Sequence, residues 1–288
     1  MNRVIPLLTV LAALFAIWYV AAVLMNAPLQ RDLYANNDNT TFSTADLISA
    51  SLNMERPKLP APHQIGAELY KLIVATDPTS KRSLVFHAAI TLEETLIGFA
   101  IGGALGVGLA VLIVAIPFLE RSLMPWIVAS QTVPIIALAP MIVVILNQFD
   151  IGGITPKAVI AAYLSFFPVT VGMAKGFRSP DPLQLDLMRT YSATRGQVMA
   201  KLRLPASLPF FFASMKIGAA AALVGAVVAE VTKSEDGGLG ARLLAGSYYG
   251  QTVQIWAALF TAAALSGVLV GAIDLIGRVT LKRLAFST

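Results

Sequence analysis

The stretch at residues 186–205, DLMRTYSATRGQVMAKLRLP, is a basic, helix-forming segment between two long apolar runs. Each flanking run is long enough to cross the roughly 30 Å hydrocarbon core of a bilayer. The polar segment must therefore lie outside the membrane, and the chain around it is expected to consist of membrane-spanning helices.

Apolar runs of this kind recur along the 288 residues, of which 57% are hydrophobic and only 13% are charged. Soluble domains carry about 25% charged residues, so most of this surface is expected to face lipid. A sheet that is not closed cannot satisfy its backbone in lipid, which favours helices. The predicted fold is an all-α integral membrane protein with six transmembrane helices. The spans are expected at residues 5–25, 96–116, 126–146, 158–174, 210–229 and 255–273.

The distribution of basic residues predicts that both termini lie inside. With this orientation, the inner segments carry most of the Lys and Arg residues outside the long segment 26–87. The same rule accounts for the formal charge of +5 without nucleic acid. The chain contains no cysteine, which excludes a disulfide framework and a thiol nucleophile. The first apolar run is longer than the roughly 7–15 apolar residues of a signal peptide, so we expect a retained helix.

Three parts are expected along the chain. Residues 1–25 form the first transmembrane helix, and residues 26–87 form an extracytoplasmic segment. Residues 88–285 form the core, which contains five helices and the polar loop 179–208. Apolar residues at helical spacing predict an amphipathic helix at 64–75. That helix would either dock an external partner or pack on the bundle.

Gly98, Gly102 and Gly106 follow one another at intervals of four residues in the second span. Small residues at this spacing let two helix backbones approach closely in lipid. The pattern predicts tight helix packing and carries no information about a substrate.

Prolines at positions 125, 134 and 140 predict a bent third span. Bent helices often line a cavity, where the freed backbone groups can be satisfied. Gln131 and Thr132 beside Pro134 are therefore candidates for a pathway wall, or alternatively for an interhelical hydrogen bond. Glu230, at the end of the fifth span, is either a gate residue or an interfacial carboxylate. The predicted translocation path comprises Gln131, Thr132, Pro134, Tyr163, Ser165, Thr170 and Glu230.

Charged residues within spans are functional candidates by default. Lys216 is close enough to the inner end of its helix to extend its ammonium group to the interface. Asp274 and Arg278 are four residues apart, which favours a local ion pair over a substrate site. The two histidines, His63 and His87, lack partners at metal-ligand spacing, so no metal site is expected.

Within the polar loop, Asp181 is a suitable N-cap and Pro182 a suitable first helical residue. We expect one short helix to Tyr191, a tight turn, and a second helix from Arg195 that Pro205 ends. Apolar side chains among basic ones indicate either a protein partner or an ordinary inner surface loop.

The loop resembles the characteristic cytoplasmic loop of ABC importer permeases. That motif has an acidic residue, two small residues and a glycine, and a Leu-Pro pair closes it thirteen residues after the glycine. Counted back from Leu204-Pro205, Asp186 takes the acidic position, Leu187 and Met188 the small positions, and Ser192 the glycine position. If the turn requires a positive φ, Ser192 would be strained there.

The resemblance extends over residues 59–285 and is closest to permeases for nitrate, taurine, alkanesulfonates and pyrimidine precursors. Glu94 stands where that subgroup commonly has Arg, and residues 26–58 have no counterpart. The matching segments are Leu59-Pro60-Ala61-Pro62, TLEETLIGF at 91–99, VPIIALAP at 133–140, Val228-Ala229-Glu230 and Gly238-Leu239-Gly240.

The resemblance implies a type I ABC importer permease fold in a bacterial inner membrane. It implies a homodimer of permeases, or a close heterodimer, bound to two cytoplasmic ATPase subunits, with an external substrate-binding protein. The chain has no G-x-x-x-x-G-K-[ST] phosphate loop, so no cofactor is expected in it, and ATP and Mg²⁺ would bind to the partner ATPase. The expected cargo is a small polar solute of the pyrimidine or vitamin precursor, sulfonate or nitrate class. The ATPase-coupling residues would be Asp186, Leu187, Met188, Arg189, Tyr191, Ser192, Arg195, Val198, Met199, Leu204 and Pro205.

Two other classes of function compete with this interpretation. An ion-coupled secondary transporter would work without an ATPase, and such proteins often show interrupted helices at matching positions in two inverted halves. Here only the third span is rich in proline. An intramembrane enzyme would need paired carboxylates, a Ser/His set or a metal cluster at bilayer depth, and the sequence offers no such set.

Overall fold

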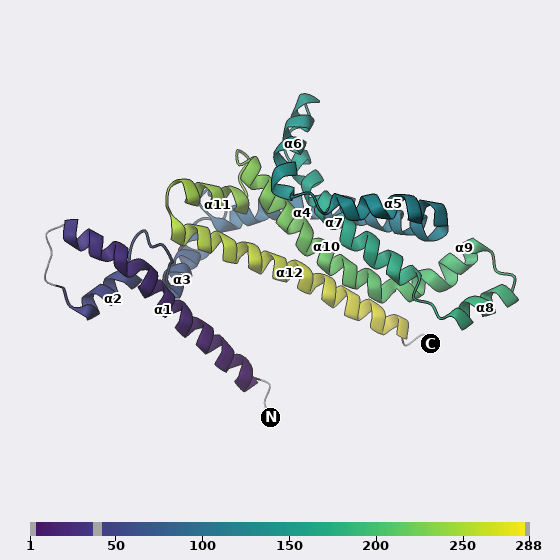
Figure 1. Ribbon diagram of the computed structural model, residues 1–288, viewed down its shortest axis with the longest axis horizontal. Coiled ribbons are helices and arrows are strands. Elements are labelled where there is room, and N and C mark those ends of the chain that lie inside the picture. Colours follow the sequence, from purple (N-terminus) through teal and green to yellow (C-terminus); the bar gives the residue numbers. More distant parts are fainter. Residues whose placement is uncertain (1–3, 37–41, 286–288) are drawn as a thin grey trace. The chain divides into compact units, whose positions relative to one another are not determined.

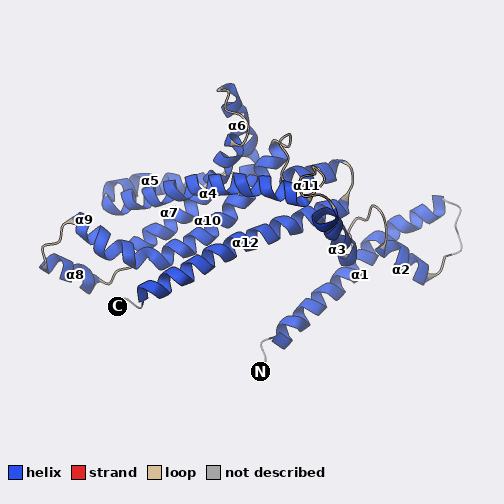
Figure 2. Cartoon of the chain, turned by 180° about the vertical axis from the view of Figure 1, so that it is seen from behind, coloured by secondary structure: helices blue, strands red, loops and turns tan. Residues whose placement is uncertain are grey.

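The computed structural model describes residues 4–36 and 42–285, and within these ranges the chain forms helices and no strands (Figures 1 and 2). The all-helical class predicted from the sequence is therefore confirmed. The chain divides into two compact units, one of residues up to 87 with 241–262 and one of residues 88–240 with 263 onward. The helices are α1 (Val4–Asn36), α2 (Thr44–Leu52), α3 (Pro62–Tyr70), α4 (Leu84–Ala115), α5 (Pro117–Ser130), α6 (Ile135–Gln148), α7 (Thr155–Phe177), α8 (Pro182–Thr190), α9 (Arg195–Val198), α10 (Leu204–Thr232), α11 (Leu239–Tyr248) and α12 (Thr252–Ala285).

Five helical segments in the described part of the chain are long and apolar enough to cross a membrane. They are Ile5–Asn36, Leu84–Ala115, Thr155–Phe177, Arg195–Thr232 and Thr252–Arg283. A sixth span exists only if α5 and α6 are counted together, and these two helices meet at an angle of 100°. The third span, predicted at 126–146 as a bent helix, is thus present as two helices separated by a sharp break. Pro134 is the extended N-cap of α6 and has no N–H to continue α5.

The first unit contains α1, which is longer than the predicted span 5–25 and continues through Pro28 to Asn36. The side chain of Asn26 explains why α1 stays helical beyond the predicted end at residue 25. It is fully buried, and its Oδ1 accepts hydrogen bonds from the backbone N–H groups of Lys58 (2.9 Å) and Leu59 (3.1 Å). Its Nδ2 donates to the carbonyls of Ser51 and Leu59. One amide thus holds the segment after α2 against α1.

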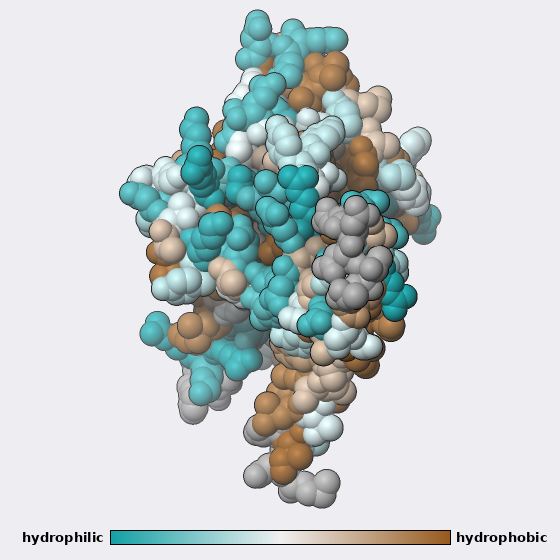
Figure 3. Space-filling model, turned by 90° about the vertical axis from the view of Figure 1, so that its left-hand side faces the viewer, coloured by the Kyte–Doolittle hydropathy of each residue, from teal (hydrophilic) through white to brown (hydrophobic). Residues whose placement is uncertain are grey.

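Farther toward the N-terminus, α1 exposes apolar side chains, as the hydrophobic column at the bottom of Figure 3 shows. Hydrophilic side chains cover much of the remaining face in the same view. The exposed apolar side chains of α1 are what a helix surrounded by lipid requires, because apolar side chains favour lipid over water.

The helix predicted at 64–75 is present as α3 and a following π turn, η1 (Lys71–Ala75). Ile65 and Leu72 are buried and Leu69 is half-buried, so the predicted apolar face exists. Ile73, which was expected on the same face, is exposed. Ile73 lies within this π turn, whose wider spacing departs from the 3.6-residue period of the prediction, and it therefore leaves the buried face.

In the second unit, α4 packs against α7 along the glycine stripe, as predicted. A Cβ at Gly98 would lie 2.4 Å from the Cβ of Ala161, and one at Gly102 would lie 2.0 Å from Ser165 Oγ. Along α10, Gly218 and Gly225 approach α7 in the same way. Small residues at these contacts let the backbones come together, which places α4, α7 and α10 in one tightly packed group.

Candidate functional site

The loop between α7 and α10 begins with a capped helix. The Oδ1 of Asp181 accepts a hydrogen bond from the backbone N–H of Leu183 (2.8 Å), and the Gln184 side chain accepts one from the Asp181 N–H (3.3 Å). Pro182 occupies the first turn of α8, where its missing N–H costs nothing. The start predicted for this helix is confirmed. On the surface of α8, Asp186 and Arg189 form an ion pair of 2.8 Å.

A tight turn follows α8, and Ser192 lies in it with φ at +54°. The Ser192 N–H donates to the Arg189 carbonyl (2.8 Å) and the Ala193 N–H to the Met188 carbonyl (3.0 Å). The condition for strain at the glycine position is therefore met, because a side chain disfavours positive φ. Thr194 then caps α9 through a hydrogen bond from the Gln197 N–H (3.3 Å).

The second helix of the loop does not end at Pro205, and that prediction was wrong. Helix α9 continues through a π turn, η2 (Met199–Arg203), directly into α10, so that 195–232 is one helical segment. The Leu204 N–H donates to the Met199 carbonyl across the widened turn. Pro205 is in the first turn of α10, where the altered register accommodates a residue without an N–H.

Helices α8 and α9 extend beyond the ends of α7 and α10, as both views in Figures 1 and 2 show. Leu183 and Tyr191 are each more than three-quarters exposed, and Leu187 is also exposed. The structure thus presents apolar side chains in a polar projection. Of the predicted coupling residues, Met188, Val198 and Met199 are half-buried, and Asp186, Leu187, Arg189, Tyr191, Ser192, Arg195, Leu204 and Pro205 are exposed.

Four of the predicted path residues gather around the bend between α5 and α6. The Tyr163 hydroxyl reaches from α7 and donates to the Ser130 carbonyl at the end of α5. Gln131 Nε2 donates to Ser130 Oγ (3.3 Å), and the Thr132 hydroxyl donates to the Ala129 carbonyl (2.7 Å). With Pro134, these side chains give the bend a neutral polar character.

Two other predicted path residues lie elsewhere, inside the helix packing. Ser165 and Thr170 of α7 are fully buried. Their hydroxyls donate to carbonyls of their own helix, Ser165 to Ala162 (3.1 Å) and Thr170 to Phe166 (2.8 Å). Ser165 faces Gly102 of α4, so the close approach of the two helices occupies the space around it.

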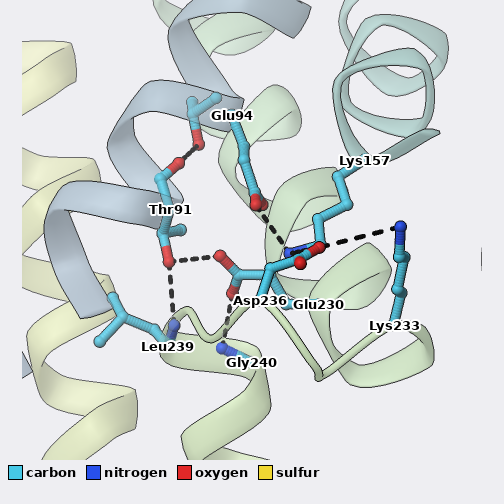
Figure 4. A network of polar contacts seen from close by, with 9 residues as sticks. Thr91, Glu94, Lys157, Glu230, Lys233, Asp236, Leu239 and Gly240 are labelled. Atoms are coloured by element: carbon cyan, nitrogen blue, oxygen red, sulfur yellow. Dashed lines mark hydrogen bonds and ion pairs between the residues drawn. The ribbon is translucent and has the colours of Figure 1, made fainter. Parts of the chain in front are cut away.

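Glu230, the last predicted path residue, is fully buried in a polar network (Figure 4). Its Oε1 accepts a hydrogen bond from the Thr91 hydroxyl (2.6 Å), and its Oε2 accepts one from the Gly240 N–H (2.7 Å). The Leu239 N–H donates to Thr91 Oγ1 (2.9 Å). Gly238, at φ +110°, closes against the carboxylate, since a Cβ there would lie 2.1 Å away. The network joins α4, α10 and the start of α11.

A buried ion pair lies beside this carboxylate and was not anticipated. Lys157 Nζ lies 2.8 Å from Glu94 Oε1, and the two side chains are 0% and 2% exposed. Half-exposed Asp236 lies 3.6 Å from Lys157 and 3.8 Å from Lys233 (Figure 4). Glu94 Oε2 has no hydrogen-bond partner among the described residues. The signal in the sequence was Glu94 itself, a carboxylate inside the apolar-flanked segment TLEETLIGF at 91–99.

Near the other end of the same unit, Lys216 pairs with Asp274 of α12 at 2.8 Å. The local pair predicted between Asp274 and Arg278 is confirmed at 2.7 Å. Lys216 therefore contributes to helix packing, because its charge is neutralised by a carboxylate that Arg278 also contacts.

Comparison with known proteins gives a consistent result. Residues 102–285 match the family described as "Binding-protein-dependent transport system inner membrane component". Formylaminopyrimidine transport permease protein ThiX of Halalkalibacterium halodurans is 33% identical over 190 residues, which cover 66% of this chain and 72% of that protein. A probable ABC transporter permease protein of Haemophilus influenzae is 30% identical over 215 residues, covering 75% and 82%. The inward-facing MetNI methionine ABC transporter shares the fold, with a TM-score of 0.54 and 23% identity over 69% of this chain and 94% of that one.

Proposed function

Because the chain belongs to the binding-protein-dependent transport system inner membrane component family, we propose that it forms the solute path of an ATP-driven importer and is moved by a separate ATPase. It is a permease component of an ABC importer in a membrane that it crosses several times. The ATPase, the substrate-binding protein and the solute are the parts that we infer for this chain.

The observation that carries the proposal is the exposed, capped projection α8–α9 at the end of an unbroken helix. Leu187 and Tyr191 offer apolar surface to a protein partner, and exposed charged side chains such as Asp186 and Lys201 set its orientation. Since 195–232 is one helical segment, a displacement of the projection is carried into the membrane. The ATPase would perform work through its different fit to two conformations of the permease.

The path that we propose passes the bend between α5 and α6. Gln131, Thr132 and Tyr163 supply neutral donors and acceptors there, and Pro134 keeps the backbone open. Ser165, Thr170 and Glu230 were included in the predicted path, and we now assign them to the packing that positions it. A neutral wall suits a small polar heterocycle, and the similarity to a formylaminopyrimidine permease supports that class of cargo.

The remaining parts of the proposal concern assembly. We propose a homodimer of this chain on two cytoplasmic ATPase subunits, which supply the ATP and Mg²⁺ sites, and a binding protein outside. Both termini and the α8–α9 projection face the cytoplasm, because the segments on that side carry the excess of Lys and Arg. The ion-coupled alternative is not favoured, since the family and its named relatives are binding-protein-dependent or ABC permeases.

The test is co-expression of the chain with its binding protein and ATPase, followed by uptake and ATP hydrolysis in proteoliposomes. Tyr191→Ala is expected to lower ATPase-coupled uptake at least tenfold, because an anchoring aromatic side chain contributes roughly 2 kcal/mol or more to an interface. Tyr248→Ala is the matched control, since Tyr248 is equally exposed on α11. Uptake driven by a proton or sodium gradient without any ATPase would refute the proposal.

A further inference from the structure

A hollow of about 510 Å³ lies between the end of α4 and the α8–α9 projection. Val111, Val114 and Ala115 of α4 form one wall. Leu185, Val198 and Met199 add apolar surface from the projection. Its volume is within the roughly 300–1,000 Å³ typical of small-molecule sites.

Three arginines, Arg189, Arg195 and Arg203, line the same hollow, and no acidic side chain lines it. Arg189 has a partner in Asp186, whereas no ion pair of Arg195 or Arg203 exists among the described residues. Guanidinium groups that converge on one space repel one another unless an anion lies between them, and they bind phosphate in a bidentate manner. The polar lining therefore favours an anion, and a phosphate group matches the guanidinium geometry.

The hollow takes in Arg189, Arg195, Val198 and Met199 of the predicted coupling residues, but it is separate from the exposed apolar face of α8 that we assign to the ATPase. Leu183, Leu187 and Tyr191 follow one another at intervals of four residues on the exposed face of α8. Leu185 and Arg189 are also four residues apart. Each lies two residues from a member of the first series, and two residues correspond to a rotation of about 200° around a helix. The two faces of α8 are thus opposite, and a partner that binds the exposed face leaves the hollow free.

We propose that this hollow binds an anionic phospholipid of the adjacent membrane leaflet. The three valine and alanine side chains belong to the last turns of a membrane-spanning helix, where acyl chains lie. The arginines lie where the headgroup of such a lipid would be. A basic pocket at the end of a transmembrane helix is the arrangement that favours anionic headgroups, with about 1 kcal/mol for each Lys or Arg near the surface.

The lipid has a structural role in this arrangement. It fills the space behind α8, neutralises the arginines and keeps the projection at a fixed position relative to α4. The stiffness of the α8–α9 projection then depends on the lipid that occupies its rear face. This inference concerns a different face of the loop from the proposed ATPase contact and stands without it.

The experiment uses the full chain, alone and in complex with its ATPase, purified after reconstitution into phosphatidylcholine or into an equal mixture of phosphatidylcholine and phosphatidylglycerol. Native mass spectrometry counts the phosphatidylglycerol molecules retained. Arg203→Gln is expected to lower retention about fivefold, the factor that corresponds to roughly 1 kcal/mol. Arg121→Gln is the matched control, since Arg121 is exposed on α5 and does not line the hollow.

The outcomes separate this inference from the proposed function. Tyr191→Ala should reduce ATPase coupling and keep the lipid, whereas Arg203→Gln should lose the lipid. Equal retention by Arg203→Gln and Arg121→Gln would overturn the inference, and so would displacement by inorganic phosphate alone, which would identify a soluble anion. Retention by the isolated chain but not by the complex would also overturn it, because the ATPase would then occupy the hollow.

Discussion

Replacing Lys157 with methionine removes the buried cation of the Glu94–Lys157 pair and keeps most of the side-chain volume. The atoms of this pair are 2.8 Å apart and its side chains are 0% and 2% exposed. Removing one partner of a buried pair leaves an uncompensated charge and costs about 3–5 kcal/mol. The Arg189–Asp186 pair is also 2.8 Å long, but its side chains are 82% and 63% exposed. Surface pairs of this kind contribute about 0–1 kcal/mol, so burial alone predicts the difference.

The assay is unfolding in dodecyl maltoside micelles by added dodecyl sulfate, followed by tryptophan fluorescence. Lys157→Met should shift the midpoint strongly, and Asp186→Asn should leave it nearly unchanged. The double variant Lys157→Met with Glu94→Gln should recover most of the loss, because neither buried charge then remains. The reasoning is refuted if Lys157→Met shifts the midpoint no more than Asp186→Asn, or if the double variant is as unstable as Lys157→Met alone.

Three other substitutions test separate features. Ser192→Gly relieves the strain of a φ of +54° and should stabilise the turn after α8 by up to about 1 kcal/mol. The expected result is slower amide exchange in residues 182–198, and faster exchange would contradict the prediction. Gly102→Ala should destabilise the chain by about 1–3 kcal/mol in thermal unfolding, because its Cβ would meet Ser165 at 2.0 Å, whereas Gly108→Ala, with nothing within 4 Å, should not. Asn26→Ala should cost about 1–3 kcal/mol and speed proteolysis of residues 43–61, because buried backbone groups lose their partners; an unchanged cleavage rate would contradict this.

Features with a local cause could be predicted from the sequence. The stripe Gly98–Gly102–Gly106 indicated close packing because the required spacing is visible in the chain itself, and the start of α8 followed from Asp181 and Pro182. The break of the third span into two helices could not be predicted from the sequence. Three prolines indicate bending, but the angle of 100° depends on how α5 and α6 pack, which no local pattern encodes.

Features that depend on distant partners could not be predicted. Lys157 pairs with a carboxylate 63 residues away, and Glu230 meets Thr91 across 139 residues. Two interpretations of Glu230 therefore stayed open before the structure, and Lys157 had none beyond its charge. Helix α1 passed its expected end because a distant segment, 51–59, satisfies Asn26. The helix end predicted at Pro205 was wrong because of a local feature. The π turn at Met199–Arg203 changes the hydrogen-bond register before Pro205, so the helix continues through the proline.

The unbroken segment Arg195–Thr232 has a mechanical consequence. A helix of 38 residues is about 57 Å long at roughly 1.5 Å per residue. If the helix tilts as a rigid body by about 5° around its centre, each end moves by about 2.5 Å, and the two ends move in opposite directions. A small push at the Arg195 tip would therefore reach the Glu230 network at nearly full amplitude, unless the weaker bonding of the π turn absorbs it first.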